Sequence, residues 1–138
     1  MESSTRVLVR EVCMPKFNVG PEFSFDPSGR FVSDNNGNGS DGSTFRELYL
    51  KGKIESLGQG RQLTVILDDG VESYGSSFLT EGFAGMVKFG YITAPQLLEK
   101  LKFEYTDEDF LFYEHKIIQY IGEALYNSSK YDPDKNSD

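Results

Sequence analysis

The chain has 138 residues, of which 38% are hydrophobic and 14% aromatic, the size and composition of one soluble globular domain. Its 14 basic and 22 acidic residues give a net charge of −8, which repels a phosphate backbone and argues against nucleic acid as a ligand. A single cysteine, Cys13, and a single histidine, His115, exclude an internal disulfide and a histidine cluster for zinc.

The first third of the chain predicts a strand, a hairpin and a loop. Residues 5–12 (TRVLVREV) contain enough β-branched residues for a strand. In the following segment PEFSFDPSGRFV, the residues Asp26-Pro27-Ser28-Gly29 place Pro and Gly where a type I turn favours them, so we expect an N-terminal β-hairpin. Residues 33–43 (SDNNGNGSDGS) are polar and rich in glycine, which predicts a mobile surface loop.

The middle of the chain predicts two helices around a strand. The first helix begins with Ser43 or Thr44 as its cap and ends near Leu57. The apolar run LTVIL at 63–67 is typical of a central strand that is covered on both faces. After an acidic turn, apolar residues recur at helical spacing, which predicts a helix over residues 77–89.

The last third predicts a short helix over residues 93–100, a strand over 101–105 and a long helix from Thr106 to Leu125. Thr106 and Asp109 have the spacing of a capping box. Strands that alternate with helices imply crossover connections, so the predicted fold is α/β, a mixed but mainly parallel sheet with helices packed on it. We expect one domain over residues 1–129 and a disordered tail over 130–138.

Two patterns resemble ligand sites only weakly. Gly37, Gly39 and Gly42 spell G-x-G-x-x-G, but the segment before them is a hairpin arm, the loop is crowded with Asn and Asp, and no clear ribose-binding acid follows. Glycines for turns are therefore the better interpretation. The carboxylates after the central strand resemble a magnesium site, although adjacent aspartates on a solvated turn are more common. We therefore expect no cofactor and no metal at these carboxylates, which are Asp68, Asp69, Glu72 and Glu81.

Ser76 and Ser77 stand where the predicted strand gives way to a helix. One of the two hydroxyls is expected to cap the first turn, and the same free amides would also stabilise a phosphate. The nucleophile elbow of a hydrolase requires G-x-S-x-G, which this segment lacks, and His115 has no orienting acid beyond Glu114. We therefore expect no catalytic residues and no enzymatic activity.

The segment LTVILDDGVESYGSSFLTEGFAGMV resembles the signature of the bacterial STAS-like family of unknown function, through Ser76, Ser77, Phe78 and Glu81. The flanking PSGRF and LLEKLKF extend the similarity to roughly residues 20–127. That family is distantly similar to STAS domains that antagonise anti-sigma factors. In those regulators a kinase with a histidine-kinase-like ATPase fold phosphorylates a serine or threonine at the same junction.

The resemblance implies a phosphate acceptor at Ser77, with Ser76 as the alternative. Gly75 and Phe78 stand where those regulators have Asp and Gly, and Phe78 also suits a core anchor of the helix. The resemblance further implies a STAS-like fold and a regulatory, protein-binding role, with a histidine-kinase-like ATPase as the partner. The residues expected to contact that partner are Asp69, Glu72, Tyr74, Phe78 and Glu81.

The beginning of the chain, MESSTRVLVREV, lacks the apolar core of a secretory signal, and no apolar run approaches the ~20 residues of a membrane span. We therefore expect a cytoplasmic, non-enzymatic regulator that contacts no membrane and works by binding a protein through residues 69–85. The alternative is a module that senses a small ligand or nucleotide near the turn between Asp69 and Ser77, in a defence or toxin-control system. An enzyme of unknown reaction is the third hypothesis.

Overall fold

The computed structural model describes residues 15–35 and 37–132, which form a small parallel sheet and the helices that pack on it. The strands are β1 (Lys16–Asn18), β2 (Leu63–Ile66) and β3 (Leu101–Glu104), in the order β1-β2-β3. The predictions of a mixed α/β fold, of a parallel sheet and of a central strand in the LTVIL run are confirmed.

The predicted N-terminal hairpin is wrong for the described residues. β1 pairs in parallel with β2, and the chain then enters α2 (Val19–Glu22) instead of turning back as a second strand. The amide of Phe23 donates to the carbonyl of Val19 at 2.9 Å, so a helical turn satisfies the backbone where a hairpin would need a partner strand. The predicted strand over residues 5–12 lies outside the described residues.

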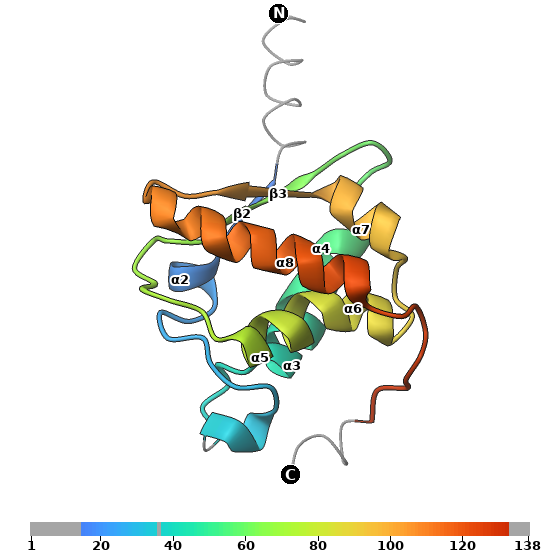
Figure 1. The fold of residues 1–138 in the computed structure, drawn as a ribbon, viewed down its shortest axis with the longest axis horizontal. Coiled ribbons are helices and arrows are strands. Elements are labelled where there is room, and N and C mark those ends of the chain that lie inside the picture. The colour runs from blue at the N-terminus through green and yellow to red at the C-terminus, as the bar shows by residue number, and fades with distance from the viewer. Residues whose placement is uncertain (1–14, 36, 133–138) are drawn as a thin grey trace, which may run out of the picture.

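The helices pack against one face of the sheet (Figure 1). On that face Phe17, Val65 and Phe103 lie in register across the three strands, and the first two are fully buried. The opposite face carries Thr64 and Ile66 of β2, which are only half-buried. The prediction that both faces of this strand are covered is therefore wrong for the described part of the chain.

Two long helices cross beneath the sheet, and each contains a π-helical turn. The first long helix runs from residue 42 to 55 as α3 (Gly42–Thr44), η2 (Phe45–Leu50) and α4 (Lys51–Glu55), close to its prediction. The second long helix runs from residue 76 to 88 and also confirms its prediction. Its segments are α5 (Ser76–Leu79), η3 (Thr80–Ala84) and α6 (Gly85–Lys88).

Glycines let these two helices approach closely. A Cβ atom on Gly42 would lie 2.9 Å from the carbonyl oxygen of Phe78, and one on Gly82 would lie 2.9 Å from the ring of Phe45. Gly37 and Gly39 have positive φ angles of 77° and 82°, as turns require. The G-x-G-x-x-G pattern thus serves turns and helix packing.

The stretch predicted as a mobile surface loop is buried at its C-terminal end. It overlaps the short helix η1 (Val32–Asn35), and Ser40, Asp41 and Ser43 are buried at the start of the first long helix. Asp41 is the N-cap of that helix, and its carboxylate accepts hydrogen bonds from the Thr44 amide, the Thr44 hydroxyl and the Ser43 hydroxyl. Polar residues can be buried here because their hydrogen bonds are satisfied, within the segment for Asp41 and Ser43 and by the Ser24 hydroxyl for Ser40.

The C-terminal part comprises α7 (Ala94–Lys100), η4 (Glu108–Phe110) and α8 (Leu111–Glu123), with β3 between the first two. Asp107, one residue after the predicted Thr106, caps η4 by accepting from the Asp109 amide. Beyond α8 the chain turns back and Tyr131 packs on the ring of Phe89. Residues 133–138 of the predicted tail lie outside the described residues, so the disorder of that tail stays a prediction.

The core lies between the sheet and these helices, and it is rich in aromatic rings. Within residues 15–35 and 37–132, no helix is long and apolar enough to cross a membrane. The largest fully buried apolar side chains are Phe17, Phe45, Phe78, Phe83, Leu50, Leu63, Leu67, Leu79, Met86, Leu97 and Ile117.

Candidate functional site

The turn after β2 is held in place by two buried aromatic residues. The hydroxyl of Tyr74 donates to the carbonyl of Leu67 at 2.7 Å, and burial raises the pKa of this phenol. The Phe78 ring lies 6.0 Å from the Tyr74 ring and is completely buried. Tyr74 and Phe78 therefore fix the turn to the core. Glu72, Ser76 and Ser77, which lie close to them in the sequence, are exposed.

Two aspartates join the carboxyl ends of the strands. The Asp68 carboxylate accepts from the amides of Thr106 and Asp107, each at 2.8 Å, and from the Thr106 hydroxyl at 3.1 Å. Burial raises the pKa of Asp68, but these hydrogen bonds outweigh it and hold the pKa below the usual value. Asp69 accepts from the Asn18 side-chain amide at 2.6 Å. Both carboxylates are thus used to connect neighbouring strands.

Neither serine caps the second long helix, so that prediction is wrong. The N-cap is Gly75, whose φ of −79° and ψ of 149° are extended, and no side-chain hydrogen bond caps this end. Ser76 and Ser77 occupy the first two helical positions, one and two residues beyond the N-cap. Only the side chain of the N-cap residue is placed to accept hydrogen bonds from the free amides of the first turn. Their exposed hydroxyls therefore have no part in capping.

Three of the five residues predicted to contact a partner are buried. Tyr74 and Phe78 belong to the aromatic core, and Glu81 is only 2% exposed. These three side chains point inward, so they cannot lie on a docking surface. Asp69 and Glu72 are exposed. The surface that remains is Asp69, Glu72, Ser76 and Ser77, which we name the serine turn.

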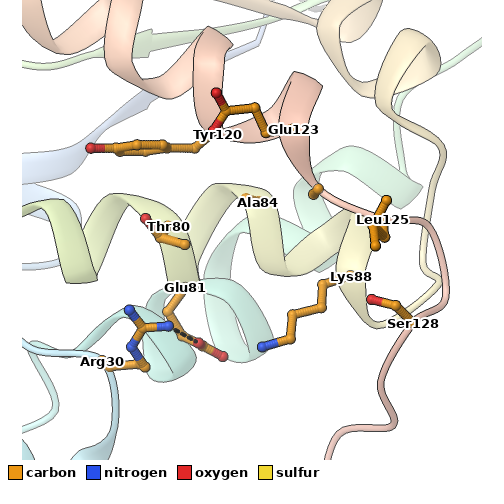
Figure 2. Close-up of a pocket in the computed structure, with 10 residues that line it drawn as sticks. Arg30, Thr80, Glu81, Ala84, Lys88, Tyr120, Glu123, Leu125 and Ser128 are labelled. Atoms are coloured by element: carbon orange, nitrogen blue, oxygen red, sulfur yellow. Dashed lines mark ion pairs between the residues drawn. The ribbon is translucent and has the colours of Figure 1, made fainter.

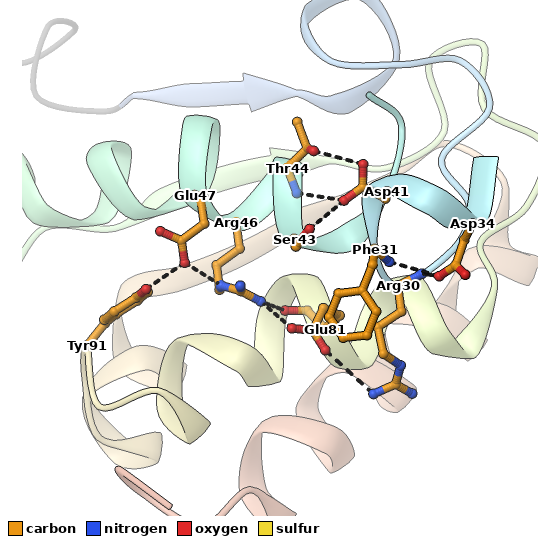
Figure 3. A network of polar contacts seen from close by, with 10 residues as sticks. All are labelled: Arg30, Phe31, Asp34, Asp41, Ser43, Thr44, Arg46, Glu47, Glu81 and Tyr91. Atoms are coloured by element: carbon orange, nitrogen blue, oxygen red, sulfur yellow. Dashed lines mark hydrogen bonds and ion pairs between the residues drawn. The ribbon is translucent and has the colours of Figure 1, made fainter. Parts of the chain in front are cut away.

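Glu81 belongs to a buried network of charges (Figure 3). The Arg46 Nη1 atom lies 2.8 Å from Glu81 Oε2 and also donates to the Glu81 carbonyl at 2.6 Å. A second cation, Arg30 Nη1, lies 3.5 Å from Glu81 Oε1. The other side of the Arg46 guanidinium donates through Nε to Glu47 Oε2 at 2.9 Å. Two arginines and two carboxylates therefore connect the loop at Arg30 with both long helices.

Arg46 is completely buried, and two aromatic rings lie against its guanidinium. Its guanidinium carbon lies 4.6 Å from the ring centre of Phe89 and 5.0 Å from that of Tyr131. The Tyr91 hydroxyl donates to Glu47 at 2.6 Å, and burial together with this bond raises the pKa of Tyr91. Sequence reasoning did not find this network. A charged residue on an amphipathic helix looks solvent-exposed, and nothing in the chain pairs two residues that are 35 positions apart.

A pocket of about 210 Å³ opens beside Glu81, between the second long helix and the end of α8 (Figure 2). One wall comes from a single face of the second long helix, and the other comes from α8 and the chain that follows it. The residues that line the pocket are Arg30, Thr80, Glu81, Ala84, Lys88, Tyr120, Glu123, Ala124, Leu125 and Ser128.

Within the ranges that the structure describes, no three histidine, cysteine, aspartate or glutamate side chains gather as a metal site would require. Comparison of the chain with models of protein families, with curated proteins and with solved structures finds no match. The resemblance to the STAS-like family accordingly stays a prediction.

Proposed function

We propose that this protein is a non-enzymatic regulator that binds a protein partner through the serine turn and is controlled by phosphorylation of Ser77 or Ser76. The observation that supports the proposal most strongly is that both serine hydroxyls are exposed and take no part in capping. Both lie exposed in the first turn of a long helix, and neither is needed to cap it. A modifying enzyme can therefore reach them without unfolding the core.

The surroundings of the serines suit a switch that acts through charge. Asp69 and Glu72 already make the serine turn acidic, and the phosphate would add about −1.5 to −2 charges at pH 7. The free amides of the first helical turn favour a phosphate on the helix itself, so phosphorylation need not disrupt the fold. A partner with an acidic or apolar contact surface would then be repelled.

The proposed partner is a bacterial histidine-kinase-like ATPase in the cytoplasm, and this part rests on the resemblance of the Ser-Ser-Phe-x-x-Glu segment. Because some of the residues predicted to contact such a partner are buried, the contact region that we propose is smaller than the predicted one. Tyr74 and Phe78 hold the turn from beneath, whereas the contacts themselves would come from the exposed side chains of the serine turn. Replacing Glu72, Ser76 or Ser77 should alter binding without altering stability.

The test compares capture of partners from the native cells by the wild-type chain, by Ser77→Asp and by Ser77→Ala, together with mass spectrometry of the serines. We expect wild type and Ser77→Ala to retain the same partner, and Ser77→Asp to lose it while its melting temperature stays unchanged. The matched control is Ser33→Asp, which adds the same charge at an exposed serine outside the serine turn.

Two results would contradict the proposal. One is that Ser77→Asp and Ser76→Asp bind the partner as tightly as wild type while mass spectrometry finds neither serine phosphorylated. The other is that Ser33→Asp weakens binding as much as Ser77→Asp does, because the effect would then come from overall charge and not from the serine turn.

A further inference from the structure

The pocket beside Glu81 is separate from the serine turn and has the makings of a small-molecule site. Concave sites that bind small ligands combine an apolar lining with a few charged groups that converge on it. Here Ala84, Ala124 and Leu125 supply the apolar part, and the charged groups come from Arg30 and Lys88. Figure 2 shows the Arg30 and Lys88 side chains converging on the Glu81 carboxylate from opposite sides.

The charge balance at the floor of the pocket is positive. The Glu81 carboxylate is already held at 2.8 Å by the buried Arg46, which leaves Arg30 only a longer contact of 3.5 Å with the other oxygen. Lys88 Nζ lies 5.5 Å from the Phe89 ring centre and forms no ion pair within the described part of the chain. Three cations, Arg30, Arg46 and Lys88, therefore stand against the two carboxylates Glu47 and Glu81, which leaves one positive charge in excess.

The carboxylate on the opposite wall does not cancel this excess. Glu123 accepts a hydrogen bond from the Gln119 side chain at 3.1 Å. In Figure 2 its carboxylate points away from Arg30 and Lys88. In a chain with a net charge of −8, a concave surface with two convergent cations is a local exception. Low-dielectric walls strengthen the attraction of such a surface for an anion.

We propose that this pocket binds a small organic anion, whose carboxylate or phosphate group lies against Arg30 and Lys88 and whose apolar part packs on Ala84 and Leu125. The hydroxyls of Thr80 and Ser128 line the same pocket and supply further donors. A volume of about 210 Å³ somewhat exceeds that of a cavity of about 150 Å³ that holds benzene, so the ligand is about ten non-hydrogen atoms in size.

The proposal is tested with the full chain, labelled with ¹⁵N, by following amide chemical shifts during titration with small aromatic probes. Phenyl phosphate and benzoate carry the two anionic groups on one apolar ring, and benzylamine carries a cation on the same ring. We expect one or both anions to shift the amides of Arg30, Ala84 and Lys88 in a saturable way, at concentrations up to about 10 mM. Benzylamine should leave them in place.

The titrations with the two anions also show which anionic group the pocket prefers. A site for a phosphate group binds phenyl phosphate more tightly, and a site for a carboxylate group binds benzoate more tightly. Lys88→Gln should weaken binding of the preferred anion about tenfold, since it removes one charge-assisted contact. The matched control is Lys102→Gln, which removes the same charge from the exposed outer face of β3 and should leave binding unchanged.

Three outcomes would overturn the proposal. The amides around the pocket do not shift with either anion, or they shift equally with benzylamine, or Lys102→Gln weakens binding as much as Lys88→Gln does. None of these outcomes bears on the serine turn, because Ser76 and Ser77 do not line the pocket.

Discussion

Arg46 and Glu81, which are 35 positions apart in the sequence, form an ion pair that is almost completely removed from solvent, with 0% and 2% of their side chains exposed. The pair joins the two long helices at the level of their π-helical turns. Because Arg46 also bonds Glu47 and Arg30 also approaches Glu81, two cations and two anions balance one another, with the partly exposed Arg30 and Glu47 flanking the buried pair. Buried charges are tolerated only when they are paired in this way.

Removal of the Glu81 carboxylate should destabilise the fold strongly. Glu81→Ala leaves Arg46 buried with Glu47 as its remaining anionic partner, and the free energy of unfolding should fall by about 3–5 kcal/mol. The measurement is equilibrium unfolding in urea. The control is Glu104→Ala, which breaks an exposed pair with Lys16 at 3.5 Å and should cost less than about 1 kcal/mol. Equal losses for the two variants would show that the buried pair contributes little.

Two glycines of the first long helix should respond oppositely to the same substitution. In Gly42→Ala the new methyl group would meet the Phe78 carbonyl oxygen and the Glu81 Cβ atom at 2.9 Å, so the helices must separate and stability should fall by about 1–3 kcal/mol. Gly52 faces open space within α4, and Gly52→Ala should raise stability by about 0.5–1 kcal/mol. Thermal unfolding of both variants tests this contrast, and a gain in both would contradict the close helix contact.

The cap of the first long helix should matter for stability, whereas the serines of the second should not. Asp41→Ala removes three hydrogen bonds, one of which caps the Thr44 amide, at a cost of about 2 kcal/mol. Ser77→Ala removes no capping bond and should change stability by less than about 0.5 kcal/mol. A loss of about 1 kcal/mol or more in Ser77→Ala would mean that its hydroxyl does cap the helix in solution.

Protonation of Asp68 should contribute to acid unfolding. Its pKa in the folded protein lies below the ordinary value of 3.8, so the stabilisation is fully present above that value and is lost as the pH falls through the folded pKa. We therefore expect the stability difference between wild type and Asp68→Asn to be constant near neutral pH and to shrink below about pH 4. Urea unfolding across this range measures it. A difference that stays constant down to the lowest accessible pH would contradict the role of the hydrogen bonds to Thr106 and Asp107.

The sequence by itself determined the order of most elements, because hydrophobic spacing is a local signal. The LTVIL run predicted the central strand, and the apolar stripe after Ser77 predicted the second long helix. It also determined the parallel arrangement, since strands separated by helices need crossover connections. The burial of Phe78 agrees with its place in that stripe and with the alternative of a core anchor, and not with the predicted partner contact.

Only the tertiary structure decided which polar residues are buried and what they do. Arg46 and Glu81 resemble surface residues in the sequence, and their burial depends on partners that approach from distant segments. The path after β1 was decided in the same way, because Phe23 packs on Phe45 and Tyr49 instead of extending a hairpin. Local propensity describes a residue and its near neighbours, whereas the desolvation of a charge is offset only by groups that the fold brings together.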